Sequence, residues 1–325
     1  MPKMNLVEAI NATLFQEMEL NDKIVVMGED VGVDGGVFRV TEGLIKKFGE
    51  QRVIDTPLAE SGIIGAAIGM AIYGLKPVTE IQFEGFIFPA YEQIVSHIAR
   101  IRTRSHGSYK CPIVLRSPYG GGVRALEHHS EAPETLYAHV PGLTVVIPSS
   151  PYDAKGLLSN ALQAEDPVIF FEPKRIYRAF KEEVPEERYT IPFGQAKIVQ
   201  EGHDVTIITY GAMVRVSMEA AELLKEKNIS CEIVDLRTVS PIDTETIISS
   251  VRKTGRCVVV HEAPRNLGIG AEISARINEK ALLDLKAPVK RVTAYDVVTP
   301  LPKLEDFHFP NAEKIINAVN YVMGF

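Results

Sequence analysis

The chain has 325 residues, of which 46% are hydrophobic and 24% charged, and its formal net charge is −7. This composition predicts a globular protein with room for two domains of ordinary size. The acidic balance disfavours nucleic acid or an anionic membrane as a partner, because both attract positive surfaces. No signal peptide core and no apolar run of ~18 residues is present. We therefore expect a cytoplasmic protein or the mature form of an imported organellar subunit.

Short β-rich runs alternate with helical stretches along the whole chain. Runs of Val, Ile and Leu are typical of strands buried on both faces of a parallel sheet. Ser150, Pro151 and Asp153 predict the start of a helix. We expect strands at residues 24–27, 78–83, 113–116, 143–147 and 168–171, and then at 205–210, 231–236, 257–260 and 289–294.

A polar segment rich in glutamate, residues 180–188, separates the two series of strands and predicts the start of a linker. The sequence therefore predicts two α/β domains with parallel sheets, residues 1–185 and 196–325. Three widely spaced cysteines, Cys111, Cys231 and Cys257, indicate buried thiols rather than disulfides or a metal site.

The first segment that points to chemistry is residues 55–62, DTPLAESG, which precedes an apolar stretch rich in alanine and glycine. A helix at residues 63–72 without a polar face must be buried on every side, and its small residues predict close packing against another chain. Glu60 lies at the mouth of that helix. A helix cap, an ion pair and proton chemistry are all open to it, and position alone favours the cap.

Two further segments follow predicted strands. Gln82 and Phe86 come after a strand end, where ligands bind in open α/β sheets, although an ordinary strand-to-loop transition is the simpler interpretation. His129 lies in the glycine-rich loop 116–130 and is a candidate general acid or base, although single histidines are more often structural. His128 and His129 lack a third metal ligand at usual spacing. Residues 268–273, GIGAEI, lack the third glycine of a dinucleotide-binding motif.

Taken together, these segments resemble the β subunits of pyruvate and branched-chain 2-oxo acid dehydrogenases. The matching motifs occur in the same order, from about residue 5 to the carboxyl end: GEDVG at 28–32, DTPLAE at 55–60, EIQF at 80–83, HS at 129–130, VIPS at 146–149, DAKGL at 153–157, DPV at 166–168, YGAM at 210–213 and VDLRTV at 234–239. The resemblance implies a transketolase-like pyrimidine-binding domain followed by a transketolase C-terminal-like domain. It also implies thiamin diphosphate as cofactor.

The resemblance assigns roles to the candidate residues. Glu60 would hydrogen-bond the aminopyrimidine ring and favour its imino tautomer, which removes a proton from the thiazolium ring. Leu58, Gln82 and Phe86 would line the pyrimidine pocket. His129 would orient the substrate and transfer protons, including during acyl transfer to a lipoyl arm.

Two further assignments come from the resemblance alone. Glu29 and Glu92 would belong to an acidic, water-filled path between paired active sites. A monovalent cation such as K⁺ would bind mainly backbone carbonyls. Those carbonyls belong to Ile113, Ala161, Leu162, Ala164 and Asp166, where Ala164 replaces an acidic residue of some relatives.

The chain lacks the Gly-Asp-Gly motif and the Asn pair through which the family's α subunit binds Mg²⁺ and the diphosphate. We therefore expect half a site, completed by an α subunit in an α2β2 heterotetramer. The second expected partner is the E2 acyltransferase, docking near an ordered carboxyl end at 322–325.

Residues 128–134 and 295–300 resemble the branched-chain type of the family, which implies a branched-chain 2-oxo acid as substrate, with pyruvate as the main alternative and acetoin third. A catalytically silent docking subunit is disfavoured by the intact Glu60 and His129. A transketolase-type half acting on sugar phosphates is disfavoured because the glycine-rich loop offers mainly Arg124 as a phosphate contact.

Overall fold

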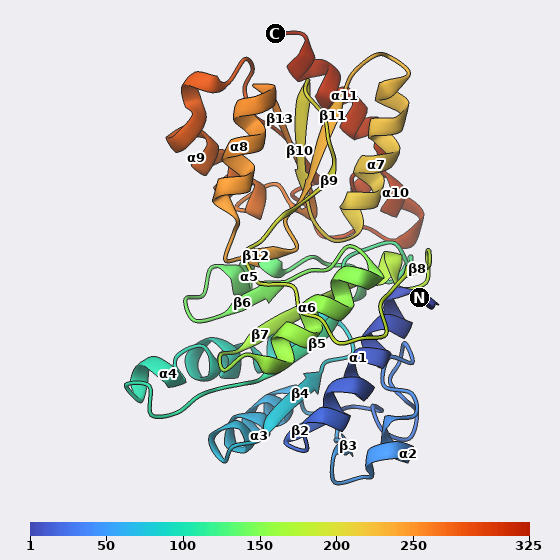
Figure 1. Ribbon diagram of the computed structural model, residues 1–325, viewed down its shortest axis with the longest axis vertical. Helices are drawn as coiled ribbons and strands as arrows, with labels where there is room; N and C mark the ends of the chain where they lie inside the picture. Colours follow the sequence, from blue (N-terminus) through green and yellow to red (C-terminus); the bar gives the residue numbers. More distant parts are fainter.

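In the computed structural model, which describes residues 1–325, two α/β domains are stacked along the long axis of the molecule (Figure 1). The amino-terminal domain contains a seven-stranded sheet in the order β12-β6-β7-β5-β4-β2-β3. Strands β2 to β7 are mutually parallel. Their bounds are β2 (Ile24–Gly28), β3 (Val53–Asp55), β4 (Lys76–Glu80), β5 (Val114–Tyr119), β6 (Thr144–Val146) and β7 (Val168–Pro173).

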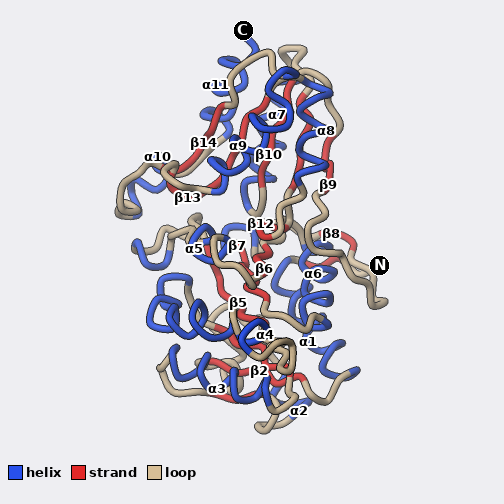
Figure 2. The backbone as a smooth tube through the Cα atoms, turned by 90° about the vertical axis from the view of Figure 1, so that its left-hand side faces the viewer, coloured by secondary structure: helices blue, strands red, loops and turns tan.

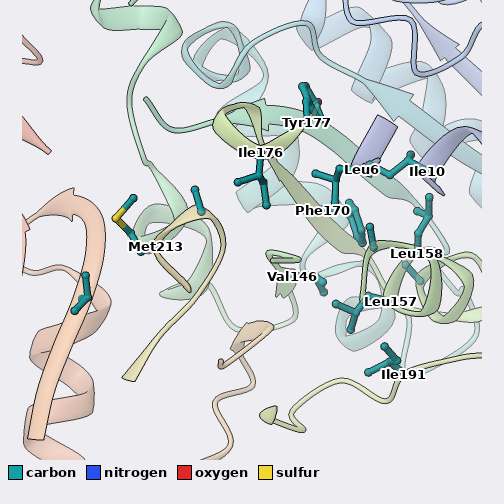
Figure 3. Packing of buried hydrophobic residues seen from close by; sticks show 14 of the residues in the cluster. Leu6, Ile10, Val146, Leu157, Leu158, Phe170, Ile176, Tyr177, Ile191 and Met213 are labelled. Carbon is teal, nitrogen blue, oxygen red and sulfur yellow. The ribbon is translucent and has the colours of Figure 1, made fainter. Parts of the chain in front are cut away.

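Helices cover both faces of this sheet. Successive strand residues point to opposite sides, so each strand contributes side chains to both hydrophobic clusters. On β7, Phe170 packs in a cluster with Leu157 and Leu158, as Figure 3 shows, whereas Phe171 belongs to the cluster on the other face. The first face carries α1 (Leu6–Leu20) and α6 (Pro151–Gln163), and the second carries α3 (Glu60–Ile72), η1 (Glu84–Ala90) and η2 (Gln93–Ile98). Shorter elements of this domain are β1 (Lys3–Met4), α2 (Leu44–Phe48), α4 (Ile101–Arg104), η3 (Glu127–His129), α5 (Glu134–Ala138), η4 (Lys174–Ile176) and β8 (Glu182–Glu183).

The carboxyl-terminal domain repeats this architecture around a five-stranded sheet in the order β14-β13-β10-β11-β9. Helices α7 and α11 pack on one face, and α8 and α9 on the other. The bounds are β9 (Lys197–Gln200), β10 (Val205–Thr209), α7 (Ala212–Lys225), β11 (Cys231–Asp235), α8 (Thr244–Thr254), β13 (Cys257–Pro264), α9 (Ile269–Ala281), η5 (Leu282–Asp284), β14 (Lys290–Ala294), η6 (Pro302–Leu304), α10 (Glu305–His308) and α11 (Ala312–Met323).

One strand joins the two domains. Strand β12 (Thr238–Ser240) leaves the second domain and pairs antiparallel with β6 at the edge of the first sheet. Figure 2 shows it beside β6 and β7, where the two domains meet. The domains therefore share a sheet edge as well as packed side chains.

A strand is found at each predicted position, although β14 is only partly buried, and the three cysteines are free and buried as predicted. Ser150 caps α6 by accepting a hydrogen bond from the Asp153 backbone N–H at 3.2 Å, as predicted. The expected strand at 78–83 is wrong at its end, because pairing stops at Glu80 and the chain then turns into η1. The edge strands β3, β9 and β12 were not predicted, nor was the pairing of β1 with β8, which lies in the expected linker.

None of the helices combines the length and the hydropathy that a membrane span requires. No group of three or more His, Cys, Asp or Glu side chains is arranged to hold a metal ion.

Candidate active site

The predicted site residues gather at the carboxyl-terminal edge of the seven-stranded sheet. This follows from the topology, since parallel strands all end at the same edge. The strand ends lead to them as follows: β2 to Glu29, β3 to Leu58 and Glu60, β4 to Gln82 and Phe86, and β5 to the loop that carries His129.

Glu60 is the first residue of α3 and is only 8% exposed. Its carboxylate makes no hydrogen bond or ion pair within the chain, and the helix end has no side-chain cap. The cap role that position alone favoured is therefore not what the structure shows. Glu29, also 8% exposed, has one carboxylate oxygen without a hydrogen-bond partner. Burial, then the nearby charges of Glu60 and Asp30, raise the pKa of Glu29.

Two of the predicted pocket residues, Gln82 and Leu58, differ in burial. Gln82 is partly buried, and its amide nitrogen donates a hydrogen bond to Asp30 at 2.8 Å. Leu58 is 80% exposed and is covered by nothing in this chain.

Aromatic rings hold the His129 imidazole in place. The ring of Phe83 lies edge-on at 4.0 Å and that of Phe86 at 5.2 Å, measured between centroids. The Nδ1 atom of His129 is buried without a hydrogen-bond partner. Burial, helped by the charges of His128 and Lys174, lowers the pKa of His129. The imidazole is therefore neutral near pH 7 and able to accept a proton.

Close contacts fix the loop that carries the histidine. A Cβ atom on Gly85 would lie 2.3 Å from the carbonyl oxygen of His128, so only glycine permits this approach of η1 to the loop. The second domain also takes part, because the Glu305 carboxylate accepts hydrogen bonds from the backbone N–H groups of Gly122 and Arg124 at 2.8 and 2.9 Å. Residues of both domains thus position His129.

Sequence reasoning missed a buried ion pair behind the histidine. The Lys174 ammonium lies 2.6 Å from the Glu84 carboxylate, and both side chains are 0% exposed. The ammonium also lies 5.6 Å from the centre of the Phe83 ring. Lys174 directly follows β7, at the sheet edge where the other strands lead to site residues. That position in the sequence could have marked Lys174 as a candidate site residue.

Two predicted groups lie apart from this cluster. The Glu92 carboxylate is 63% exposed and bonds Gln93 and His97 on the surface. The residues assigned to a cation lie around the end of α6 and the starts of β5 and β7, at the opposite edge of the sheet. There the ammonium of Lys76 donates to backbone carbonyls.

Comparison with known proteins identifies the architecture. The family model "Transketolase, pyrimidine binding domain" matches residues 2–179, and "Transketolase, C-terminal domain" matches residues 194–315. A solved structure described as "Split gene transketolase, inactive beta4 tetramer" superposes with a TM-score of 0.82 over 99% of both chains, at 24% identity. At this level of identity the structural match supports the fold and nothing more.

Curated relatives are more similar to this chain in sequence than that solved structure is. The "Pyruvate dehydrogenase E1 component subunit beta" of Acholeplasma laidlawii is 57% identical over 96% of this chain and 95% of its own length. The protein of the same name from Staphylococcus aureus strain Mu50 is 52% identical over the full length of both chains. The chain is an E1 β subunit of the 2-oxo acid dehydrogenases. Proteins of this family act with an α subunit and an E2 component, in a thiamin diphosphate-dependent complex.

Within the E1 β subunits, the expectation of a branched-chain substrate is not supported. The relatives at 50–57% identity carry the name of pyruvate dehydrogenase. The alternative of pyruvate therefore fits better.

Proposed function

We propose that this chain is the β subunit of a pyruvate dehydrogenase, which with an α subunit decarboxylates pyruvate oxidatively and acylates a lipoyl group on E2. The observation that carries the proposal is the arrangement of Glu60 and Glu29 at one sheet edge, together with a neutral His129, without partners for these groups in the chain itself. The names of the relatives support pyruvate as the substrate.

The chain's groups fit the aminopyrimidine half of thiamin diphosphate. Glu60 offers an unpaired carboxylate to a ring nitrogen, and the buried carboxyl of Glu29 keeps a second acid beside it. The amide of Gln82, the aromatic ring of Phe86 and the exposed Leu58 lie around the same edge and would line the ring. When bound, the cofactor supplies the electron sink for decarboxylation of the 2-oxo acid.

Proton transfer at the substrate falls to His129. A neutral imidazole accepts a proton without first losing one, and the rings of Phe83 and Phe86 pack against it. Glu92 would lie on a water path toward a second site only if another subunit covers its surface. We therefore propose the acidic path as a property of the assembly.

A partner subunit would complete the site. The face of α3 that carries Gly62, Ala66, Gly69 and Ile72 is exposed in the single chain, so only one side of this apolar helix is buried. We propose that subunit contacts in an α2β2 assembly cover this face and Leu58, and that the α subunit holds Mg²⁺ and the diphosphate.

The E2 acyltransferase would dock near the carboxyl end. Helix α11 continues to Met323 with Val322 fully buried, and Phe325 follows with 63% of its surface exposed. An ordered end with an exposed aromatic side chain is suited to contact with a partner. Deletion of residues 324–325 should weaken E2 binding, and unchanged affinity would contradict this docking site.

The test of the proposed function uses the chain purified together with its α partner. Glu60→Gln should lower turnover of pyruvate by roughly 10² or more, because general acid–base groups contribute on that scale. Glu50→Gln, at an exposed acid before β3, is the matched control and should leave turnover unchanged. Turnover of 3-methyl-2-oxobutanoate above that of pyruvate would contradict the substrate assignment, and wild-type turnover by Glu60→Gln would contradict the mechanism.

A further inference from the structure

A lysine side chain occupies the carbonyl cluster at the end of α6. The Nζ atom of Lys76 donates to the carbonyl oxygens of Leu162, Gln163 and Ala164 at 3.0, 3.2 and 3.4 Å. Leu162 and Ala164 are two of the residues whose carbonyls the family resemblance assigns to a monovalent cation. The chain thus brings its own cation to oxygens that a K⁺ ion would need.

Other groups of the proposed cation site also have donors from the chain. The Ile113 carbonyl accepts the Val168 N–H at 2.9 Å, and the Ala161 carbonyl accepts the Ala164 N–H at 3.1 Å. The Asp166 side chain, beside its assigned carbonyl, forms an ion pair with Arg102, which places a further positive charge next to these carbonyls. A second positive charge on the carbonyls that bind the ammonium would repel it at close range. K⁺ therefore does not fit unless Lys76 leaves.

The position of Lys76 in the fold explains why its ammonium binds the carbonyls at the end of α6. It is the first residue of β4, and its backbone N–H donates to the Lys23 carbonyl at 2.8 Å. The last carbonyls of α6 lack helical donors and lie at the negative end of the helix dipole. Burial lowers the pKa of Lys76, and the nearby Glu165 charge opposes that shift. An ammonium is well matched to three convergent carbonyls, because it carries three donors.

We infer that the ammonium of Lys76 replaces the monovalent cation in this chain, tying the start of β4 to the end of α6 and making the pyrimidine-binding domain independent of K⁺. The contact lies at the amino-terminal edge of the sheet, whereas the candidate active site lies at the carboxyl-terminal edge. The inference therefore does not rest on the proposed function, and its test needs no turnover.

The test measures the melting temperature of the full-length chain in KCl, NaCl and tetramethylammonium chloride at equal ionic strength. The wild type should melt within about 1 °C in all three salts. Lys76→Met should melt roughly 3–6 °C lower in tetramethylammonium chloride, because it loses a charged donor to three carbonyls, and KCl should restore at least about half of the loss. Lys23→Met, an exposed lysine at the neighbouring strand, is the control and should behave as the wild type.

Two results would overturn the inference. One is a K⁺-specific rise of several degrees in the wild type, and the other is a Lys76→Met chain that melts as the control does. Crystals soaked with Tl⁺ locate the ion directly. We expect no anomalous peak at the carbonyls of Leu162 and Ala164 in the wild type and one in Lys76→Met. A peak in the wild type would contradict the inference even if the variant fails to fold.

Discussion

Removal of the Lys174 ammonium should destabilise the chain in a pH-dependent manner. Lys174 and Glu84 are fully buried, with 2.6 Å between nitrogen and oxygen. Burial, opposed by Lys174, raises the pKa of Glu84 to about 7. In Lys174→Met the carboxyl keeps its burial and loses its partner, so its pKa rises further. Breaking a buried pair from one side should lower the free energy of unfolding by about 3–5 kcal/mol.

The pH dependence of this loss follows from the direction of the shift. A carboxyl whose pKa is higher in the folded state than in the unfolded state favours folding below its unfolded pKa, near 4.5. That contribution is lost as the pH rises through the folded value of about 7. In the variant the folded pKa is higher still, so the deficit relative to wild type should grow between pH 6 and pH 8.

The assay is urea denaturation at pH 6 and pH 8, applied also to two further variants. Glu84→Gln/Lys174→Met should recover a large part of the stability at pH 8, because no charge is then buried. Lys181→Met breaks an exposed pair with Glu8 and should cost no more than about 1 kcal/mol. Equal deficits at both pH values, or a double variant no more stable than the single one, would refute the reasoning.

Three further substitutions test the contacts that hold the candidate site in place. Tyr210→Phe removes the 2.6 Å hydrogen bond to Glu134, whose pKa burial raises to about 8, and should cost about 1–3 kcal/mol in urea denaturation. Gly85→Ala places a Cβ atom 2.3 Å from the His128 carbonyl oxygen and should lower turnover roughly 10-fold or more while the far-ultraviolet circular dichroism is kept. Glu29→Gln should be more stable than wild type at pH 8 but not at pH 4, because the raised pKa of Glu29 opposes folding once that carboxyl ionises. A stability gain that is equal at both pH values would contradict the last account.

The buried strands were predictable because their composition alone requires burial on two faces. Among the edge strands, β14 was predicted, whereas β3, β9 and β12 were not predictable, because they are short and their pairing depends on segments that are distant in sequence. The end of β4 was misplaced because residues 81–83 keep an apolar pattern, while their position follows from contacts with Asp30 and His129. Such contacts depend on the folded sheet and leave no periodic signal.

The candidate site was predictable as a set of loops, because each loop follows a strand of one parallel sheet. The environment of each side chain could not be predicted from the sequence. Nothing in the sequence near Glu60 indicates that its carboxylate lacks a partner, and nothing near Lys76 indicates that it reaches the end of α6. Both facts depend on elements that are far apart in the chain. The division of the chain into domains at residues 185 and 196 stays a prediction. Strand β12 complicates this division, because it belongs to the second half of the chain and pairs in the first sheet.

The most direct test of the account is the release of CO₂ from pyruvate by the chain assembled with its α subunit and thiamin diphosphate. The account predicts release by the wild type and by Glu50→Gln, and a loss of roughly 10² or more in Glu60→Gln. Undiminished release by a correctly assembled Glu60→Gln complex would contradict the central claim that this carboxylate forms the chain's half of the site.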